Sequence, residues 1–201
     1  MSRILTGREH VAALALPLAR LEADAERVDE WGRRLARVLA RGGRLLAVGN
    51  GGSAAQAQHL TAELVGRYRD VDRAPLSAIA LHAESSSFTA ICNDFGADHA
   101  FARQVRAHGR PGDVLIALTT SGYSSNVVAA VEEAADCGIA SWAVTGPAPN
   151  PVCDLADEAV CVEADYAPTI QEIHQIVVHL LCAAVDTELR VATPGEEALT
   201  R

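Results

Sequence analysis

Five short apolar segments, each separated from the next by a stretch with helical spacing or an irregular passage, most constrain the fold of this 201-residue chain. Strands that are apolar at every position are typical of a parallel sheet buried on both faces, and parallel neighbours need a helical crossover. The pattern therefore predicts an α/β protein, a three-layer α/β/α sandwich around a roughly five-stranded parallel sheet. The expected strands are Leu45–Val48, Ala78–Leu81, Val114–Leu118, Ala140–Val144 and Glu158–Val162.

The segment before the first expected strand has helical periodicity. Between about Arg8 and Ala40, apolar residues such as Val28, Trp31 and Leu35 recur every three or four positions. This spacing predicts N-terminal helices, either one long amphipathic helix or two consecutive ones. Because they have no strand of their own to cover, we expect them to pack against another copy of the chain.

No linker rich in Pro, Gly or Ser and no internal repeat divides the sequence, so we expect one domain over residues 1–201. Within it, residues 1–41 are expected to be the helical segment for oligomer packing, residues 42–190 the α/β core and residues 191–201 a flexible tail. A last helix is expected from about Thr169 to Arg190.

All 17 basic residues are arginines, and this excludes several enzyme classes. A chain without lysine cannot form a Schiff base with a carbonyl substrate and cannot supply the lysine of a P-loop. With 26 acidic residues the net charge is −9, which disfavours a broad basic face for nucleic acid or an anionic membrane. We expect neither as a partner.

The five cysteines contain no C-x-x-C pair and are odd in number. They are therefore interpreted as small buried hydrophobic residues in a reducing compartment. The N-terminal residues lack an apolar signal core, and no apolar run approaches 18 residues. These features predict a cytoplasmic protein.

Two expected strands end in chemically unusual loops. The first loop, Gly49–Ala54, fits the dinucleotide pattern G-x-G-x-x-[GA], with Asp70 or Asp72 roughly 20 residues further on. A glycine-rich turn can also be a tight corner between a strand and a helix, so a nicotinamide cofactor is only weakly indicated.

The second loop carries five Ser and Thr hydroxyls between Thr119 and Asn126, just before an expected helix. Helix N-termini offer free N–H groups and a positive dipole end, which favour phosphate. One hydroxyl would be enough to cap the helix. The excess of hydroxyls therefore predicts a phosphate site that needs no lysine.

His59 and Glu63 lie four residues apart on the expected helix after the glycine loop and so share one face. This spacing suits a shared metal ion or an acid–base pair, although a solvated surface pair is the commoner case. Arg67 continues the same face. In the last helix, polar groups from Gln171 to His179 interrupt an apolar sequence, and a structural buried histidine is the simplest reading of His179.

These features belong to a set of six motifs between about Gly43 and Glu188. The motifs are Gly49-Asn50-Gly51-Gly52-Ser53, His59 with Glu63, Gly66-Arg67-Tyr68, Asn93-Asp94-Phe95-Gly96, Thr120-Ser121-Gly122, and Gln171-Glu172-Ile173-His174 with His179. In this order and spacing they resemble the phosphoheptose isomerases. The resemblance implies the flavodoxin-like sugar isomerase (SIS) fold and a homotetramer with active sites between subunits.

The resemblance also implies an aldose–ketose isomerase of heptose biosynthesis that converts sedoheptulose 7-phosphate to D-glycero-D-manno-heptose 7-phosphate through an enediol. Glu63 and His179 would be the acid–base pair. One zinc ion per subunit would be held by His59, Glu63, Gln171 and His179. The substrate would contact Asn50, Gly51, Gly52, Ser53, Glu63, Arg67, Asn93, Asp94, Thr119, Thr120, Ser121, Ser124 and Gln171, with Ser53, Thr120, Ser121 and Ser124 around the phosphate.

Two of these implied roles conflict with simple chemistry or geometry. Glu63 cannot be a tightly held zinc ligand and a free base at the same moment, so the metal is loosely held or another group moves the proton. Gln171 and His179 are about 12 Å apart on a regular helix, too far for one zinc ion. We therefore expect the helix to start after Gln171, or the two residues to come from different subunits.

Three other functions remain open at this stage. A close branch of the fold comprises DiaA-like proteins that bind a replication-initiation partner without catalysis, but they typically lack the counterparts of Glu63 and His179. An isomerase of another sugar phosphate would share most pocket residues. A nicotinamide-dependent enzyme would leave the hydroxyl loop and the His59–Glu63 pair unexplained.

Overall fold

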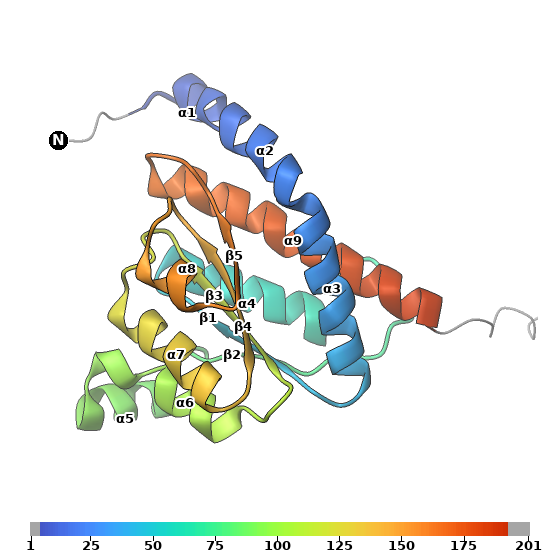
Figure 1. Ribbon diagram of the computed structural model, residues 1–201, viewed down its shortest axis with the longest axis vertical. Helices are drawn as coiled ribbons and strands as arrows, with labels where there is room; N and C mark the ends of the chain where they lie inside the picture. Colours follow the sequence, from blue (N-terminus) through green and yellow to red (C-terminus); the bar gives the residue numbers. More distant parts are fainter. Residues whose placement is uncertain (1–4, 193–201) are drawn as a thin grey trace, which may run out of the picture.

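A parallel sheet lies at the centre of the chain in the computed structural model, which describes residues 5–192 (Figure 1). Its five strands run in the order β2-β1-β3-β4-β5, and every neighbouring pair is parallel. The expected architecture is therefore confirmed. The strands are β1 (Leu45–Val48), β2 (Ala78–Ala80), β3 (Val114–Thr119), β4 (Ala140–Thr145) and β5 (Glu158–Cys161).

Helices cover both faces of this sheet. The described helices are α1 (Gly7–Ala13), α2 (Ala15–Leu21), α3 (Ala25–Ala40), α4 (Gly52–Val65), α5 (Ser85–Phe95), α6 (Ala102–His108), α7 (Ser125–Asp136), α8 (Pro151–Leu155) and α9 (Ala167–Ala192), with 3-10 turns η1 (Glu22–Asp24) and η2 (Ala97–His99). Buried residues of α3, α4 and α9 form one hydrophobic cluster with the sheet, and buried residues of α6, α7 and α8 form the other.

Alternation along the strands divides the core between the two faces. In β3, Val114, Ile116 and Leu118 point to the face covered by α3, α4 and α9, whereas Leu115 and Ala117 point to the opposite face. Successive side chains of a strand project to opposite sides, so a strand buried on both faces must be apolar throughout. This is why the apolar runs predicted the strands closely.

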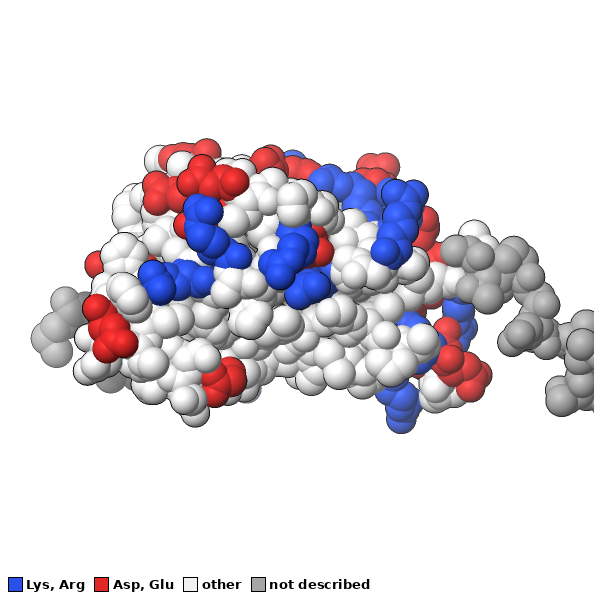
Figure 2. Space-filling model, turned by 90° about the horizontal axis from the view of Figure 1, so that it is seen from below, with Lys and Arg blue, Asp and Glu red and all other residues white. Residues whose placement is uncertain are grey.

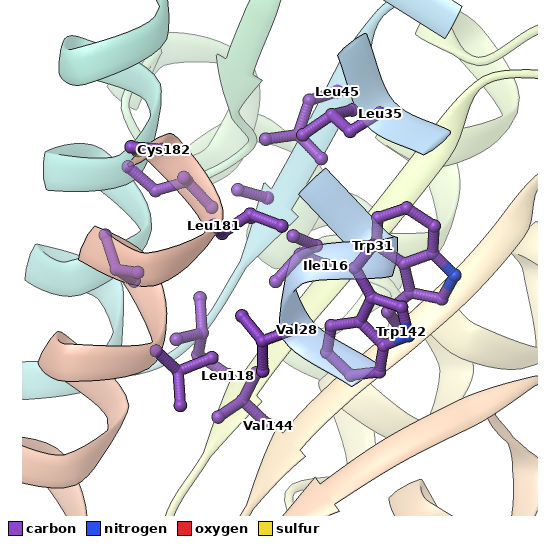
Figure 3. Packing of buried hydrophobic residues seen from close by; sticks show 14 of the residues in the cluster. Val28, Trp31, Leu35, Leu45, Ile116, Leu118, Trp142, Val144, Leu181 and Cys182 are labelled. Carbon is purple, nitrogen blue, oxygen red and sulfur yellow. The ribbon is translucent and has the colours of Figure 1, made fainter. Parts of the chain in front are cut away.

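Two stacked tryptophans anchor α3 to the sheet. The rings of Trp31 in α3 and Trp142 in β4 lie 5.3 Å apart and are nearly parallel, at 11° (Figure 3). The indole N–H of Trp31 donates to Glu158 at 2.9 Å, and Arg34 pairs with the same carboxylate and lies over the Trp142 ring. The stack therefore also connects α3 to β5.

The N-terminal helices form a nearly continuous rod that extends past the sheet (Figure 1). Sequence periodicity predicted one or two helices here, and the structure has three with a 3-10 turn before α3. Helix α1 has no buried residue, and Val11, Leu16 and Leu18 on α1 and α2 are 68%, 59% and 48% exposed. Within one chain, these apolar side chains remain largely open to solvent.

The predicted ends of the elements differ from the observed ends by a few residues. Strand β2 ends one residue early and β5 ends at Cys161, whereas β3 and β4 each extend to a threonine at the carboxyl edge of the sheet. The last helix begins at Ala167, with Pro168 in its first turn, where a missing backbone N–H has no helical partner to lose. The tail expected over 191–201 lies, from residue 193 onward, outside the described residues.

The cysteines only partly match their expected burial. Cys182 is buried in α9, but Cys92, Cys137, Cys153 and Cys161 are partly exposed, so the expectation is wrong for these four. They lie on surface helices, at a helix end or on the edge strand β5, where one side of the residue faces solvent. All five are free thiols.

Charged side chains are interspersed on the surface seen from below in Figure 1. Figure 2 shows arginines next to acidic residues in the upper part of this view and no continuous basic area on this face. Ion pairs of the described residues include Arg106–Glu133 and Arg37–Glu188. Within residues 5–192, no helix combines the length and apolarity needed to cross a membrane.

The crossing of α3 and α9 provides a test of the packing. A Cβ atom on Gly32 would lie 2.3 Å from Cβ of Ala184 and 3.0 Å from the carbonyl oxygen of Leu181. We expect Gly32→Ala to lower the free energy of unfolding by about 1–3 kcal/mol, although alanine favours a helix, because the two helices must separate. Urea denaturation at fixed protein concentration measures this change. Gly7→Ala, where a Cβ meets no atom within 4 Å, is the matched control, and equal effects of the two substitutions would contradict the packing.

Candidate active site

The two unusual loops lie together where the strand order reverses. Strand β1 pairs with β2 on one side and with β3 on the other, so the loops after β1 and β3 flank the switch point at the carboxyl edge of the sheet. Ligands of open α/β sheets bind at this place. The loops also lead into the N-termini of α4 and α7, which present free backbone N–H groups there.

In the hydroxyl loop, some hydroxyls are hydrogen-bonded to the loop's own backbone and others are not. Thr119 is buried and its hydroxyl accepts from the Gly122 amide at 3.2 Å, while the Ser121 hydroxyl accepts from the Tyr123 amide at 3.2 Å. Ser124 is the N-cap residue of α7 but makes no side-chain capping bond. Simple helix capping therefore does not explain this serine.

A pair of amide side chains joins the two loops. Asn50 donates to Asn126 at 2.8 Å, and Asn126 donates back to Asn50 at 3.0 Å. Asn126, on the first turn of α7, was not among the predicted site residues. Its place at the end of the hydroxyl loop was visible in the sequence, but its pairing depends on the spatial proximity of two loops that are 76 residues apart.

The Asn150 side chain packs against the hydroxyl loop at Gly122. It is buried, donates to Thr145 and to the Pro147 carbonyl, and accepts from the Cys153 amide. Gly122 has a φ of +71°, and a Cβ there would lie 2.0 Å from the Asn150 side chain. The loop conformation therefore requires glycine at this point.

A second group of site residues lies further along α4, against α9. The Nε2 atoms of His59 and His179 are 3.1 Å apart, and His59 Nε2 is 3.3 Å from Oε1 of Glu63. The His59 and Glu63 side chains are 42% and 21% exposed. They face a helix of the same chain, so the reading as a solvated surface pair does not hold.

Two neighbours of His179 were missed by the sequence reasoning. The Tyr68 ring stacks on the His179 ring at a centroid distance of 5.8 Å and an angle of 28°. Gln175 Nε2 lies 3.1 Å from His179 Nε2. Gln175 could have been found from its i, i+4 spacing to His179, whereas Tyr68 reaches His179 only through the fold of the loop after α4.

Gln171 lies apart from this group within one chain. Its side chain covers Gly52 at the start of α4, where a Cβ would approach it to 2.5 Å, and its carbonyl accepts from Gln56. Both Gln171 and His179 lie on α9, so the expectation that the helix starts after Gln171 is wrong. Pro168 in the first turn permits this early start.

The donor set was compared with the needs of a zinc ion. Tetrahedral donors about 2.1 Å from zinc lie about 3.4 Å from one another, and imidazole and carboxylate are common zinc ligands. The measured spacings of 3.1 and 3.3 Å around His59 Nε2 fit this chemistry. Within residues 5–192, however, no group of three or more His, Cys, Asp or Glu side chains is already arranged around a metal position. The donor types of His59, Glu63 and His179 suit zinc, but the side chains as placed in the described structure do not form a zinc site.

Cys182 lies one turn beyond His179 and remains a thiol. Burial raises its pKa to about 12, and the nearby Glu63 and Asp186 carboxylates act in the same direction. It is therefore not an activated nucleophile at neutral pH.

The remaining predicted residues lie at the periphery in one chain. Asn93 and Asp94 are exposed near the end of α5, and Asn93 donates to Asp94 at 2.7 Å. Arg67 is exposed in the loop after α4. A cavity of about 590 Å³ beside β2 is lined by Gln58, Thr61, Ala62 and Val65 of α4 among others, a different side of that helix from His59 and Glu63.

Comparisons with known proteins agree with this geometry. A family model described as "SIS domain" matches residues 9–146. A phosphoheptose isomerase from Streptomyces coelicolor is 58% identical over 189 residues, which cover 94% of this chain and 81% of that protein. Solved structures of phosphoheptose isomerases from Francisella tularensis and Neisseria gonorrhoeae superpose with TM-scores of 0.80 and 0.77 at 31% and 37% identity. They cover 91% and 90% of this chain, and each is matched over 100% of its own length.

The buried His174 of α9 should make the stability of the protein depend on pH. His174 is fully buried, its Nε2 donates to the Thr145 carbonyl at 3.0 Å, and Nδ1 has no partner within the described structure. Burial lowers its pKa to about 4, below the usual value of 6.5. The unfolded chain therefore binds a proton between pH 6.5 and 4 that the folded chain does not, so stability falls as the pH is lowered through this range.

We expect this histidine to remove about 3 kcal/mol of the free energy of unfolding between pH 6.5 and 4. In His174→Gln, whose amide can still donate to Thr145 but does not titrate, this part of the pH dependence should be lost. Urea titrations of both proteins at matched concentration across the range measure the difference. Parallel pH profiles would show that His174 is not held neutral.

Proposed function

This chain belongs to the phosphoheptose isomerases of the SIS domain family, and from that premise we propose that it interconverts sedoheptulose 7-phosphate and D-glycero-D-manno-heptose 7-phosphate through an enediol. The chain is thus an isomerase of heptose biosynthesis rather than a DiaA-like binding protein or a nicotinamide enzyme. The assignment of the individual steps to residues is our own.

The observation that carries the proposal is the meeting of His59, Glu63 and His179 between α4 and α9. His59 and Glu63 lie about 10 and 16 Å along α4 from the helix N-terminus at Gly52. The substrate carries its phosphate on C7 and reacts at C1 and C2, at the other end of the molecule. A phosphate site separated from an acid–base centre suits such a substrate.

We place the phosphate at the N-termini of α4 and α7. Ser53, Thr120, Ser121 and Ser124 supply hydroxyls, and the helix ends supply N–H groups and a positive dipole. Thr119 shapes the loop from its buried side. Asn50, Gly51, Gly52, Arg67, Asn93, Asp94 and Gln171 are proposed to contact the sugar or to shape its pocket.

The chemistry requires one proton to move from C1 to C2. A base removes a proton from C1 while the C2 carbonyl oxygen gains one, and the electron pair of the C–H bond forms the C1–C2 double bond of the enediol. Return of a proton to C2 and loss of the O1 proton complete the aldehyde. Glu63 and His179 are proposed to serve as this acid–base pair, each near enough to exchange protons with the other through His59.

Zinc is proposed to be held by His59, Glu63 and His179, with Gln171 of a second copy as the fourth ligand. A bound zinc ion would polarise the substrate oxygens and stabilise negative charge on them. Because Glu63 cannot bind zinc tightly and accept a proton at once, we propose that its contact with the metal is loose. The separation of Gln171 from His59 within one chain supports the contribution of a second subunit.

We also propose that the chain self-associates as a homotetramer, in which a second copy would supply Gln171. The exposed apolar residues Val11, Leu16 and Leu18 lie on helices that extend past the sheet of their own chain (Figure 1). Exposed apolar side chains on one rod-like segment are typical of a surface that another protein covers. A second copy of the chain is the proposed occupant.

The direct test of function is a proton NMR assay with sedoheptulose 7-phosphate in deuterated water. The wild-type protein should produce an aldoheptose 7-phosphate, and Glu63→Gln should lower kcat by about 10²-fold or more, because the base is removed while the shape is kept. Glu132→Gln, on the exposed side of α7, removes the same charge far from the site and should leave the rate unchanged.

An inactive wild type supplied with zinc would refute this substrate, and turnover of another ketose phosphate would reassign it. Full activity of Glu63→Gln would refute the role of Glu63. Deuterium at C2 of the product would show that the transferred proton exchanges with solvent.

Native mass spectrometry tests assembly and metal together. We expect four chains of 21.1 kDa each, with one zinc ion per chain. His59→Gln should lose zinc and keep the four-chain assembly, because His59 lies between α4 and α9 rather than on the N-terminal helices. Gln171→Leu should weaken zinc retention, whereas Gln58→Leu, on the other side of α4, should not. A monomer, or zinc that survives His59→Gln, would contradict the respective proposal.

A further inference from the structure

A buried ion pair connects the segments that carry the acid–base residues. Nε of Arg73, in the loop between α4 and β2, lies 2.9 Å from Oδ1 of Asp186 in α9, and the two side chains are 4% and 9% exposed. Burying charges is unfavourable unless they are paired and their remaining hydrogen-bonding groups are satisfied. Here the remaining groups of both side chains are bonded to backbone next to the proposed site.

The guanidinium of Arg73 closes the C-terminal end of α4. Its Nη2 donates to the Glu63 carbonyl at 2.8 Å, and its Nη1 donates to the carbonyls of Leu64 and Ala74 at 3.0 and 2.8 Å. The last carbonyls of a helix lack intrahelical donors. Arg73 therefore fixes the turn from which the Glu63 side chain projects.

The carboxylate of Asp186 fixes the loop that follows α4. Its Oδ2 accepts from the backbone amides of Arg69 and Asp70, each at 3.1 Å. These amides come directly after Tyr68, whose ring stacks on His179. Asp186 lies seven residues after His179, two helical turns along the same side of α9.

We propose that Arg73 and Asp186 are positioning residues for proton transfer: together they set Glu63 at the end of α4 and hold Tyr68 against His179. The inference rests on the proposed function, because it assigns the proton transfer to those two residues. Neither Arg73 nor Asp186 touches the substrate. A pair that only stabilised the fold would change how much enzyme is folded, but not how each folded enzyme breaks the C–H bond.

The first variant, Arg73→Lys, keeps the charge beside Asp186 but cannot reproduce the planar fork that reaches Glu63 and Leu64. The second, Asp186→Asn, keeps the shape and loses the charge. For each, kcat and KM are measured with sedoheptulose 7-phosphate and with the same substrate deuterated at C1. The ratio of the two kcat values is the isotope effect on C–H cleavage.

We expect kcat to fall by about tenfold or more, because small displacements of a reacting group are costly. KM should stay within about threefold, since the phosphate loops are at the other end of α4. The isotope effect should rise, because proton abstraction becomes more fully rate-limiting. The control Arg190→Gln breaks the exposed pair between Arg190 and Asp70 on the same loop, at 2.6 Å, and should change none of these values.

A lower kcat with an unchanged isotope effect would reflect lost folded enzyme and would overturn the positioning role, as would wild-type kinetics in both variants. A measurement without substrate separates failure of the positioning role from failure of the proposed function. In NMR spectra, the His179 ring resonance should shift in Arg73→Lys and not in Arg190→Gln, because the stacked Tyr68 ring moves. Such a shift with an inactive wild type would refute the substrate and keep the positioning; no shift would overturn the positioning itself.

Discussion

The packing of α4 against α9 determines where the chemistry of this protein can take place. Both helices cover the same face of the sheet, and both begin at its carboxyl edge. Gly52 lies beside Gln171, and His59 lies beside His179, so the helices run in the same direction and in register. The relative positions of His59, His179 and Gln171 follow from this register. The Arg73–Asp186 pair fixes the far end of the same helix pair.

This register places two different kinds of group along α4. Near the sheet, helix N-termini and hydroxyls provide a site for an anion without a lysine. Further along α4, His59 lies within hydrogen-bonding distance of both Glu63 and His179, and these three are the groups that we propose to bind metal and exchange protons. A sugar phosphate that reacts at the end opposite its phosphate uses both regions at once. The amide pair Asn50–Asn126 joins the two loops through two hydrogen bonds.

The fold was predictable because burial on both faces makes the central strands β1, β3 and β4 largely apolar, and this signal is local. The hydroxyl loop was visible for a similar reason, since its Ser and Thr residues lie close together in the sequence, and its role in binding phosphate is a proposal. The start of α9 was not, because a proline in the first turn was compatible with either a loop or a helix at Gln171. Tyr68 and Asp186 were missed because their contacts join segments more than 100 residues apart, which no local pattern encodes.

The central proposal is that the substrate binds with its phosphate at the two loops and its reacting carbons at Glu63. A crystal structure of Glu63→Gln with sedoheptulose 7-phosphate bound would test it most directly. The account predicts the phosphate among Ser53, Thr120, Ser121 and Ser124, with C1 or C2 within about 3.5 Å of the residue 63 side chain. A phosphate bound elsewhere, or reacting carbons remote from both residue 63 and His179, would contradict it.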